Sequence, residues 1–197
     1  MPSLLRLELP EIDNSGQLQC LWKDGLGIGN LSGLRILGCK RRVSFGEEEE
    51  QGLPYNLQRL EIWTCDKLER LPHGLRSYTS LAELIIEDCP KLVSFPEMGF
   101  PLMLRGLAIS NCESLSSLLD RMMMRNSSNN VCHLEYLEIE ECPSLICFPK
   151  GRLPTTLRRL FISHCENLVS LPEYIHVCAL EQLIIKSCPS LIGFPKG

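Results

Sequence analysis

Leucine and isoleucine recur along this chain in one fixed frame. From Leu134 to Pro149 the frame has leucine, leucine and isoleucine at offsets 0, 3 and 5, cysteine at 8, leucine at 11, phenylalanine at 14 and proline at 15. Further copies, the last three of them looser, start at Leu57, Leu81, Leu157, Leu180, Leu104, Leu31 and Leu4. Self-similarity with a period of about 20–30 residues is typical of a solenoid, in which each repeat forms one coil.

The first part of each repeat predicts a short β-strand. Leu137 and Ile139 alternate with Tyr136, Glu138 and Glu140, so the two aliphatic side chains point inward and the other three point outward. One such strand cannot bury its apolar face alone, whereas copies stacked about 4.8 Å apart form a parallel sheet with a continuous core. Proline after the last apolar position prevents a regular return helix. We therefore expect an α/β fold, a right-handed solenoid with a concave parallel β-sheet and a mostly irregular or 3₁₀ convex side.

The repeats run through the whole chain, which predicts a single domain over residues 1–197 with about eight repeats. Neither end carries the polar cap that terminal repeats of a complete solenoid need. The chain is therefore expected to be a fragment of a longer array or an incomplete gene product.

The composition is that of an ordinary globular protein. Hydrophobic residues make up 44% and charged residues 22% of the chain, and no apolar run approaches the ~18 residues of a membrane span. The formal net charge is −4. Nucleic-acid binders more often present a basic stripe, so the charge balance argues against a nucleic-acid partner.

Seven of the eleven cysteines occupy the same repeat position: Cys39, Cys65, Cys89, Cys112, Cys142, Cys165 and Cys188. A cysteine placed by the repeat is more often a structural thiol than half of a disulfide, and parallel Cβ vectors of neighbouring strands disfavour bridging. We therefore predict buried, reduced thiols that act as weak donors to the backbone of the turn.

Cysteine and histidine stand close together in three places: Cys132-His133, His164-Cys165 and His176-x-Cys178. Such pairs could provide a Cys–His nucleophile or a zinc site. However, the chain has no C-x-x-C motif, and Cys165 occupies the repeat position that should point into the core. Structural thiols and surface histidines are roughly ten times more frequent in this situation. The sequence therefore predicts no enzyme, no cofactor and no metal site.

Several segments between the repeats read as loops. Gly25, Gly27 and Gly29 lack the G-x-G-x-x-G spacing, and no Gly-Lys-Ser/Thr follows, so a turn is favoured over a nucleotide site. The charged runs Lys40–Arg42 and Glu47–Glu50 are interpreted as one solvated convex loop. The segment Arg121–Asn130 is interpreted as a protruding flexible loop.

The outward positions of the predicted strands carry the candidate binding residues. Single exposed apolar residues are normal, but here aromatic and aliphatic residues are grouped with arginines on one concave sheet, a composition typical of binding hot spots. The predicted protein-binding residues are Arg59, Trp63, Ile85, Tyr136, Glu138, Arg159, Phe161 and Ile184. On the first strands, Glu8, Arg35 and Glu61 alternate in sign, which favours their pairing across the sheet.

The frame L-x-x-L-x-I-x-x-C-x-x-L-x-x-[FL]-P resembles leucine-rich repeats, with cysteine where the commonest kinds have asparagine. Cysteine there, together with the CPSL and FP elements, resembles the C-terminal repeats of plant intracellular disease resistance receptors. The most similar class has an N-terminal coiled coil and a nucleotide-binding module. The resemblance covers Leu31 to Pro195. The chain has no phosphate loop, so nucleotide binding is not assigned to it.

The resemblance implies a protein-binding and regulatory module that senses pathogen effectors and holds the nucleotide-binding module inactive. The implied partner is a pathogen effector, a guarded host protein or the receptor's own nucleotide-binding module. The implied location is cytoplasmic or nuclear, in agreement with unbridged cysteines. The alternative is a substrate-recruiting repeat domain of a ubiquitin-ligase adaptor, and an enzyme comes third. An upstream phosphate loop would favour the receptor, and an upstream F-box the adaptor.

Overall fold

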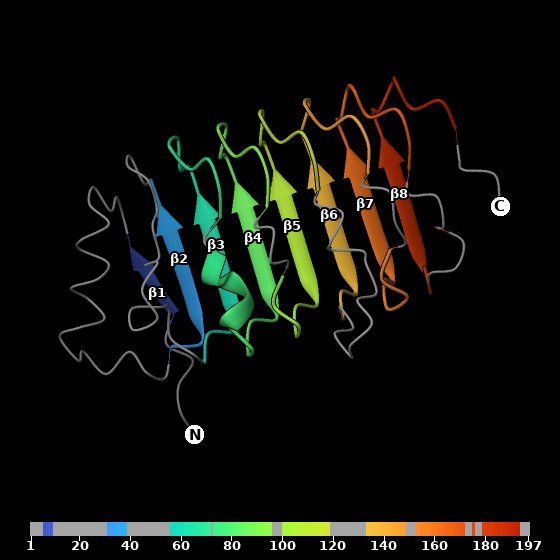
Figure 1. The fold of residues 1–197 in the computed structure, drawn as a ribbon. Helices are drawn as coiled ribbons and strands as arrows, with labels where there is room; N and C mark the ends of the chain where they lie inside the picture. Colours follow the sequence, from blue (N-terminus) through green and yellow to red (C-terminus); the bar gives the residue numbers. More distant parts are fainter. Residues whose placement is uncertain are drawn as a thin grey trace.

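Eight short strands, one per repeat, lie side by side in a single parallel sheet (Figure 1). This computed structural model describes residues 6–9, 31–38, 56–71, 73–95, 100–118, 133–148, 153–171, 175 and 179–193. The strand order in the sheet is the order in the sequence. The strands are β1 (Arg6–Leu9), β2 (Gly33–Leu37), β3 (Arg59–Trp63), β4 (Glu83–Glu87), β5 (Gly106–Ser110), β6 (Tyr136–Glu140), β7 (Arg159–Ser163) and β8 (Gln182–Lys186).

The alternation within each strand determines which side chains form the core. The second and fourth residues of β2 to β7 are at most 1% exposed, from Leu34 and Ile36 to Leu160 and Ile162. The register aligns these positions across the sheet, so leucine lies next to leucine and isoleucine next to isoleucine. Burial of each such side chain contributes roughly 1.5–3 kcal/mol. The predicted strand phase is confirmed.

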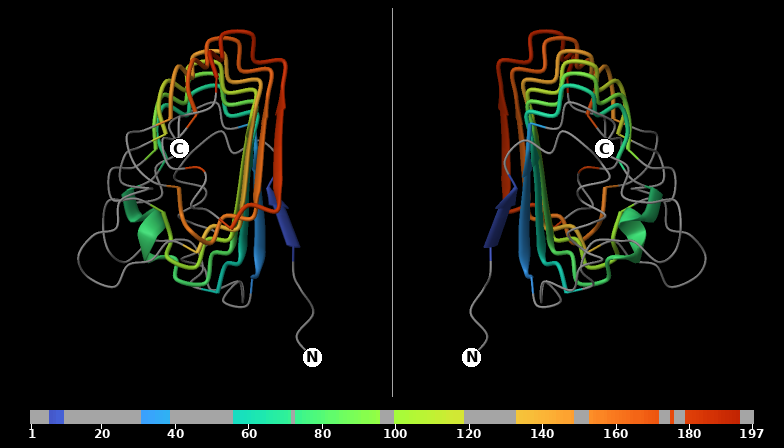
Figure 2. Two further views of the ribbon diagram at one scale, coloured as in Figure 1. Left: turned by 90° about the vertical axis from the view of Figure 1, so that its right-hand side faces the viewer. Right: turned by 90° about the vertical axis from the view of Figure 1, so that its left-hand side faces the viewer.

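The rest of each coil returns to the core without regular helix. The leucines at offset 11 and the leucine or phenylalanine at offset 14 are buried in the complete described repeats, for example Leu145 and Phe148. On the return side of the coil, the described residues include one 3₁₀ helix that is longer than a single residue, η2 (His73–Ser77). End-on views show the sheet as one wall of the coil and the irregular segments opposite (Figure 2). No helix within the described ranges has the length and apolar character required to cross a membrane.

Each of the strands β2 to β8 ends in a turn built around one residue with positive φ. Gly38 occupies this place after β2, with φ of 63°. After β3 to β8 the place is taken by residues with φ between 50° and 53°: Thr64, Asp88, Asn111, Glu141, His164 and Ser187. A left-handed conformation at a residue with a Cβ costs roughly 1–2 kcal/mol, so the turn is maintained by the structure around it.

The repeat cysteine comes directly after this turn residue and stabilises the turn. Its Sγ donates to the carbonyl oxygen of the last strand residue, as from Cys142 to Glu140 at 3.3 Å and from Cys165 to Ser163 at 3.4 Å. All the cysteines in the described ranges are thiols, as predicted. The predicted burial is confirmed for five repeat cysteines that are 0% exposed, Cys65, Cys89, Cys112, Cys142 and Cys165. It is wrong for Cys188, which is only half-buried because it follows the last described strand of the sheet. Cys39 lies outside these ranges.

Other predictions concern residues outside the described ranges. These are the glycine turn at Gly25–Gly29, the charged runs Lys40–Arg42 and Glu47–Glu50, the loop Arg121–Asn130, and the residues Cys132, His176 and Cys178. They remain predictions, as does the division of the chain into domains.

Candidate protein-binding face

The outward side of the sheet consists of the first, third and fifth residues of the strands and is called the concave face below. The strand phase and register place all eight predicted binding residues on it. β5 divides them into two groups, because its own outward residues are Gly106, Ala108 and Ser110. The first group, on β3 and β4, is Arg59, Trp63 and Ile85. The second group, on β6 to β8, is Tyr136, Glu138, Arg159, Phe161 and Ile184.

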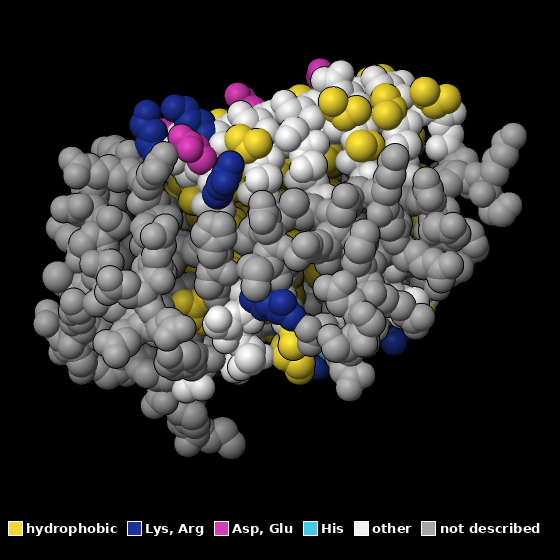
Figure 3. All heavy atoms as spheres, viewed as in Figure 1, with side chains coloured by type: hydrophobic (Ala, Val, Ile, Leu, Met, Phe, Trp, Pro, Cys, Tyr) yellow, Lys and Arg dark blue, Asp and Glu magenta, His cyan; other side chains and the backbone are white. Residues whose placement is uncertain are grey.

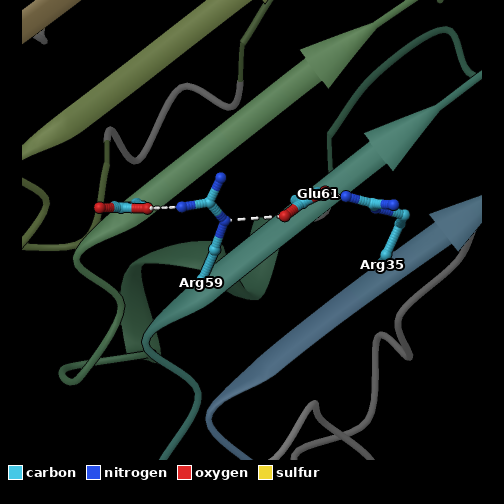
Figure 4. Close-up of polar contacts among 4 residues, drawn as sticks. Arg35, Arg59 and Glu61 are labelled. Atoms are coloured by element: carbon cyan, nitrogen blue, oxygen red, sulfur yellow. Dashed lines mark hydrogen bonds and ion pairs between the residues drawn. The ribbon is translucent and has the colours of Figure 1, made fainter. Parts of the chain in front are cut away.

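Four charged residues of β2 to β4 form a chain of ion pairs (Figure 4). Glu61 accepts from Arg35 Nε at 2.5 Å and from Arg59 Nε at 2.7 Å, and Arg59 Nη1 also pairs with Glu83. The side chain of Glu61 is only 2% exposed because the two arginines cover it. The hydrogen bond to Glu61 is the main cause that raises the pKa of Arg59. The predicted pairing of Arg35 with Glu61 is confirmed, whereas the side chain of Glu8 lies outside the described part.

This network changes the interpretation of Arg59. Two carboxylates of the chain itself already bind its guanidinium, so fewer of its donors are available to a partner. Arg59 and Glu61 also line a cavity of about 480 Å³ near the amino ends of β2 to β4. We therefore interpret Arg59 as a residue that organises the face, with less capacity for direct recognition than the sequence indicated.

Arg35 also stacks on Trp63, with its Cζ 4.2 Å from the ring centroid. This distance is within the range of cation–π interactions, so one face of the indole is covered. The Nε1 atom of Trp63 is buried and has no hydrogen-bond acceptor among the described residues. Arg35 was not among the predicted binding residues. The feature of the sequence that could have identified Arg35 is its outward position, next to Glu61 in the strand register.

The second group forms a continuous surface over three adjacent strands. The register pairs Tyr136 with Arg159, Glu138 with Phe161, and Phe161 with Ile184. The hydroxyl of Tyr136 donates to the carboxylate of Glu138. Burial, followed by this hydrogen bond, raises the pKa of Tyr136, so the phenol is neutral at physiological pH. Aromatic rings held in this way offer a large contact area at low entropic cost.

Carboxylates lie on both sides of β5, on β4, on β6 and in the turns that follow them. They are Glu87, Asp88, Glu138, Glu140 and Glu141. Burial raises the pKa of Glu87, and the nearby carboxylates of Asp88, Glu140 and Glu61 add to the effect. Glu140 accepts from the hydroxyl of the buried Ser163 at 2.8 Å. Its carboxylate also lies 3.9 Å from Nδ1 of His164.

The geometry weakens the nucleophile and metal alternatives. Cys165 is buried, and burial raises the pKa of its thiol to about 12, so little thiolate is present at neutral pH. Glu140, Glu141 and His164 place one potential ligand atom each within 4.8 Å of one another. The side chains of Glu141 and His164 are exposed, and exposed acidic groups often reach such distances without a metal.

A second surface feature lies along the rim above β6 to β8. Hydrophobic side chains gather there in the space-filling view (Figure 3). Ile146 is 54% exposed and Ile192 is 89% exposed, and Val93 occupies the same repeat position at 44%. The sequence analysis did not predict this rim, although an aliphatic residue recurs at offset 12 of several repeats.

Parts of the chain are similar in sequence to plant disease resistance proteins. No family model matches the chain. A protein of Arabidopsis thaliana named as a disease resistance protein, At3g14460, is 41% identical over 117 residues, which are 58% of this chain and 8% of that protein. Disease resistance protein RPP4 of the same species is 28% identical over 165 residues, 83% of this chain and 14% of RPP4. TMV resistance protein N of Nicotiana glutinosa is 27% identical over 158 residues, 80% of this chain and 13% of protein N.

Among solved structures, the leucine-rich-repeat domain of the type III effector XCV3220 (XopL) matches with a TM-score of 0.50 and 23% identity. The match covers 100% of this chain and 73% of that one. This likeness shows the fold: the chain is a leucine-rich-repeat solenoid. The chain spans only a small part of the length of the resistance proteins that it resembles.

Proposed function

We propose that this solenoid is the recognition and regulatory module of a plant intracellular immune receptor of the coiled-coil, nucleotide-binding class. In this role it senses a pathogen effector or a guarded host protein and restrains the receptor's own nucleotide-binding module. The proposed location is the cytoplasm or the nucleus. The similarity to plant disease resistance proteins supports the biological setting.

The continuous aromatic and charged surface on β6 to β8 supports the binding role most strongly. Tyr136, Arg159 and Phe161 are adjacent in the register of a rigid parallel sheet. Large aromatic side chains next to arginine are the usual composition of binding hot spots, and a rigid sheet lowers the entropic cost of presenting them. The proposal therefore assigns recognition mainly to the second group, with Arg35, Arg59 and Trp63 as a preorganised neighbouring part of the same face.

The test is an immune-response assay with a full-length receptor that carries this chain. Tyr136→Ala, Arg159→Ala and Phe161→Ala are compared with wild type at equal protein levels. Removing a true hot-spot residue typically costs ~2 kcal/mol or more, about 30-fold in affinity, so we expect a loss of the response to the effector.

Arg158 provides a matched control. It immediately precedes β7, and its side chain is 56% exposed and pairs with Glu181. Arg158→Ala removes the same charge next to Arg159 without changing the concave face and should retain the response. If the Arg159 and Phe161 variants accumulate normally and respond fully, recognition does not use this face. If they respond without effector, the face restrains the receptor.

A further inference from the structure

The charge of the concave face changes sign between β6 and β7. On β4 and on β6, two of the three outward residues are glutamates. The outward residues of β7 and β8 include two cations and no carboxylate, and they are called the cationic surface below. They are Arg159, Phe161, Ser163, Gln182, Ile184 and Lys186.

Arg159 has no ion-pair partner in the protein, although it occupies the same strand position as Arg59. Two carboxylates of the chain bind the guanidinium of Arg59. The register neighbours of Arg159 are Tyr136 and Gln182, which are uncharged. None of the ion pairs among the described residues includes Arg159, and its side chain is exposed. Its guanidinium donors are therefore available to an acceptor on another molecule.

On the β6 side, Glu138 accepts a hydrogen bond from a different donor. It lies beside Phe161 in the register, and its carboxylate accepts from the hydroxyl of Tyr136. Burial and this hydrogen bond raise the pKa of Tyr136, whereas the charge of Arg159 acts in the opposite direction. The guanidinium therefore lies close enough to act on the phenol, and no carboxylate on this side forms an ion pair with it.

Lys186 supplies a second positive charge next to the aromatic ring of the cationic surface. Its Nζ lies 5.7 Å from the ring centroid of Phe161, within the range of cation–π interactions. This contact does not neutralise the ammonium, and Lys186 is absent from the ion pairs of the described ranges. Arg159 precedes Phe161 by two residues, about 7 Å along the strand. Phe161 and its register neighbour Ile184 therefore have an unpaired cation on each side along the strands.

A carboxylate next to an apolar side chain is complementary to this arrangement. The planar guanidinium of arginine binds a carboxylate through two parallel hydrogen bonds, and an aromatic ring beside it offers a large apolar contact. A nucleic acid fits less well, because its evenly spaced phosphates would also meet Glu138 and Glu140 on the adjacent strand. A protein segment can present its acidic groups at β7 and β8 and neutral groups elsewhere.

From these observations we propose that Arg159 and Lys186 bind carboxylates of an acidic segment of a separate protein partner. An apolar side chain next to those carboxylates packs on Phe161 and Ile184. The glutamates of β6 repel acidic groups, so they fix the side of the face on which the partner's carboxylates lie. Lys186 is thereby a specificity-determining residue that the sequence analysis did not identify. This inference rests on the proposed function and specifies the chemistry of the partner.

The first test selects ligands without assuming their sequence. The whole 197-residue chain is immobilised and incubated with a phage library of short random peptides, and sequencing of the bound phage gives residue frequencies relative to the starting library. We expect aspartate and glutamate next to aromatic or aliphatic residues to be enriched at least about threefold, and lysine and arginine to be depleted. A bound population without this acidic enrichment would overturn the proposal. Equally tight binding of a single-stranded oligonucleotide would do the same.

Variants of the two cations decide whether the cationic surface is the binding place. The charge reversal Arg159→Glu with Lys186→Glu should invert the selection, so that lysine and arginine are enriched. Fluorescence anisotropy then measures the Kd of the most enriched acidic peptide for wild type. Arg159→Gln and Lys186→Gln should each weaken this peptide at least about fivefold, and added salt should weaken it further.

Arg158→Gln with Lys91→Gln is the matched control, because it removes two exposed charges of the same kinds outside the cationic surface. It should keep the Kd within about twofold of wild type. Circular dichroism confirms that each variant is folded. Equal weakening by the control pair, or an acidic preference that survives the charge reversal, would contradict the assignment.

The immune assay separates this inference from the proposed function. If Phe161→Ala loses the response and Arg159→Gln with Lys186→Gln keeps it, the face recognises its partner without these cations, and the inference is wrong. If the double glutamine variant accumulates normally and loses the response, the inference is supported. If acidic peptides bind as expected and neither variant changes the response, the chemistry of the surface is right and the proposed function is wrong.

Discussion

In the five buried repeat cysteines, Cys65, Cys89, Cys112, Cys142 and Cys165, the sulfur combines two properties, burial and a hydrogen bond to the backbone carbonyl two residues earlier. A thiol is small enough for the core and still donates weakly to the turn, which explains how cysteine can occupy the place of an asparagine. Cys147, by contrast, is exposed on the rim. The chain therefore contains thiols of the same chemistry in two very different environments.

These environments predict different reactivity. Iodoacetamide in native buffer should modify Cys147 quickly, whereas Cys142 and Cys165 should react only after unfolding, because their thiols are buried. Mass spectrometry of the digested protein measures the modified fraction at each position over time. Labelling of Cys142 at the rate of Cys147 would show that the turn is open in solution.

The turn residue next to each cysteine predicts a stabilising substitution. His164 has φ of 51°, a conformation that glycine adopts without the Cβ penalty and that Gly38 adopts in the turn after β2. His164→Gly should raise the free energy of unfolding by up to about 1 kcal/mol, since the penalty of roughly 1–2 kcal/mol is partly offset by the greater entropy of unfolded glycine. Urea melts measure the change. Ser110→Gly, at the end of a strand without positive φ, should instead destabilise the protein.

Glu87 predicts a pH dependence. Its raised pKa means that the folded state binds its proton more tightly than the unfolded state, whose value is near 4.5. Its contribution to stability therefore decreases as the pH rises through the interval between 4.5 and the higher folded-state pKa. Glu87→Gln should be more stable than wild type at pH 7, and the difference should disappear below pH ~4. Urea melts of both proteins from pH 4 to 8 test this sign.

At the scale of the strand, position in the alternation determines the energetic effect of a substitution. Leu137 is 0% exposed, so Leu137→Ala should cost about 2–5 kcal/mol through the cavity that it opens. Glu138→Ala, on the neighbouring outward position, should change stability by less than about 0.5 kcal/mol. Similar losses in the two urea melts would contradict the assigned phase.

The place of a strand within the sheet also determines how much a substitution in its core position destabilises the protein. Leu160 and Leu183 are equivalent residues and register partners on β7 and β8, yet Leu160 is 1% exposed and Leu183 is 37% exposed. Only Leu160 is packed between strands on both sides within the described sheet. Leu160→Ala should therefore cost at least twice as much as Leu183→Ala, measured by chemical denaturation under the same conditions.

The strands were predictable because the alternation of inward and outward residues recurs in many repeats. When the repeats are aligned, it falls at the same positions each time. The same alternation correctly placed the candidate residues on one face. The alternation could not show which outward side chains form hydrogen bonds or ion pairs with one another, since this depends on rotamers and on contacts between strands. Glu61 illustrates the limit: it stands at an outward position and is nevertheless 2% exposed under Arg35 and Arg59. The stacking of Arg35 on Trp63 was hidden for the same reason.

At the scale of the whole molecule, the sheet is a linear array in which each strand pairs only with its sequence neighbours. The ion-pair network on β2 to β4, the small outward residues of β5 and the aromatic surface on β6 to β8 therefore occupy separate stretches of one array. Energetic effects in such arrays are carried mainly by adjacent repeats. Substitutions in the first stretch should leave the packing of the third unchanged.

The sequential strand order also has an evolutionary consequence. Because the described turns after β3 to β8 share one conformation and one cysteine contact, a gene rearrangement that gains or loses one whole repeat among them would leave each junction intact. Such an event would move the aromatic surface relative to the arginine network by one strand spacing, about 4.8 Å, without altering either. Unequal recombination could thus change, in discrete steps, which partners fit this face.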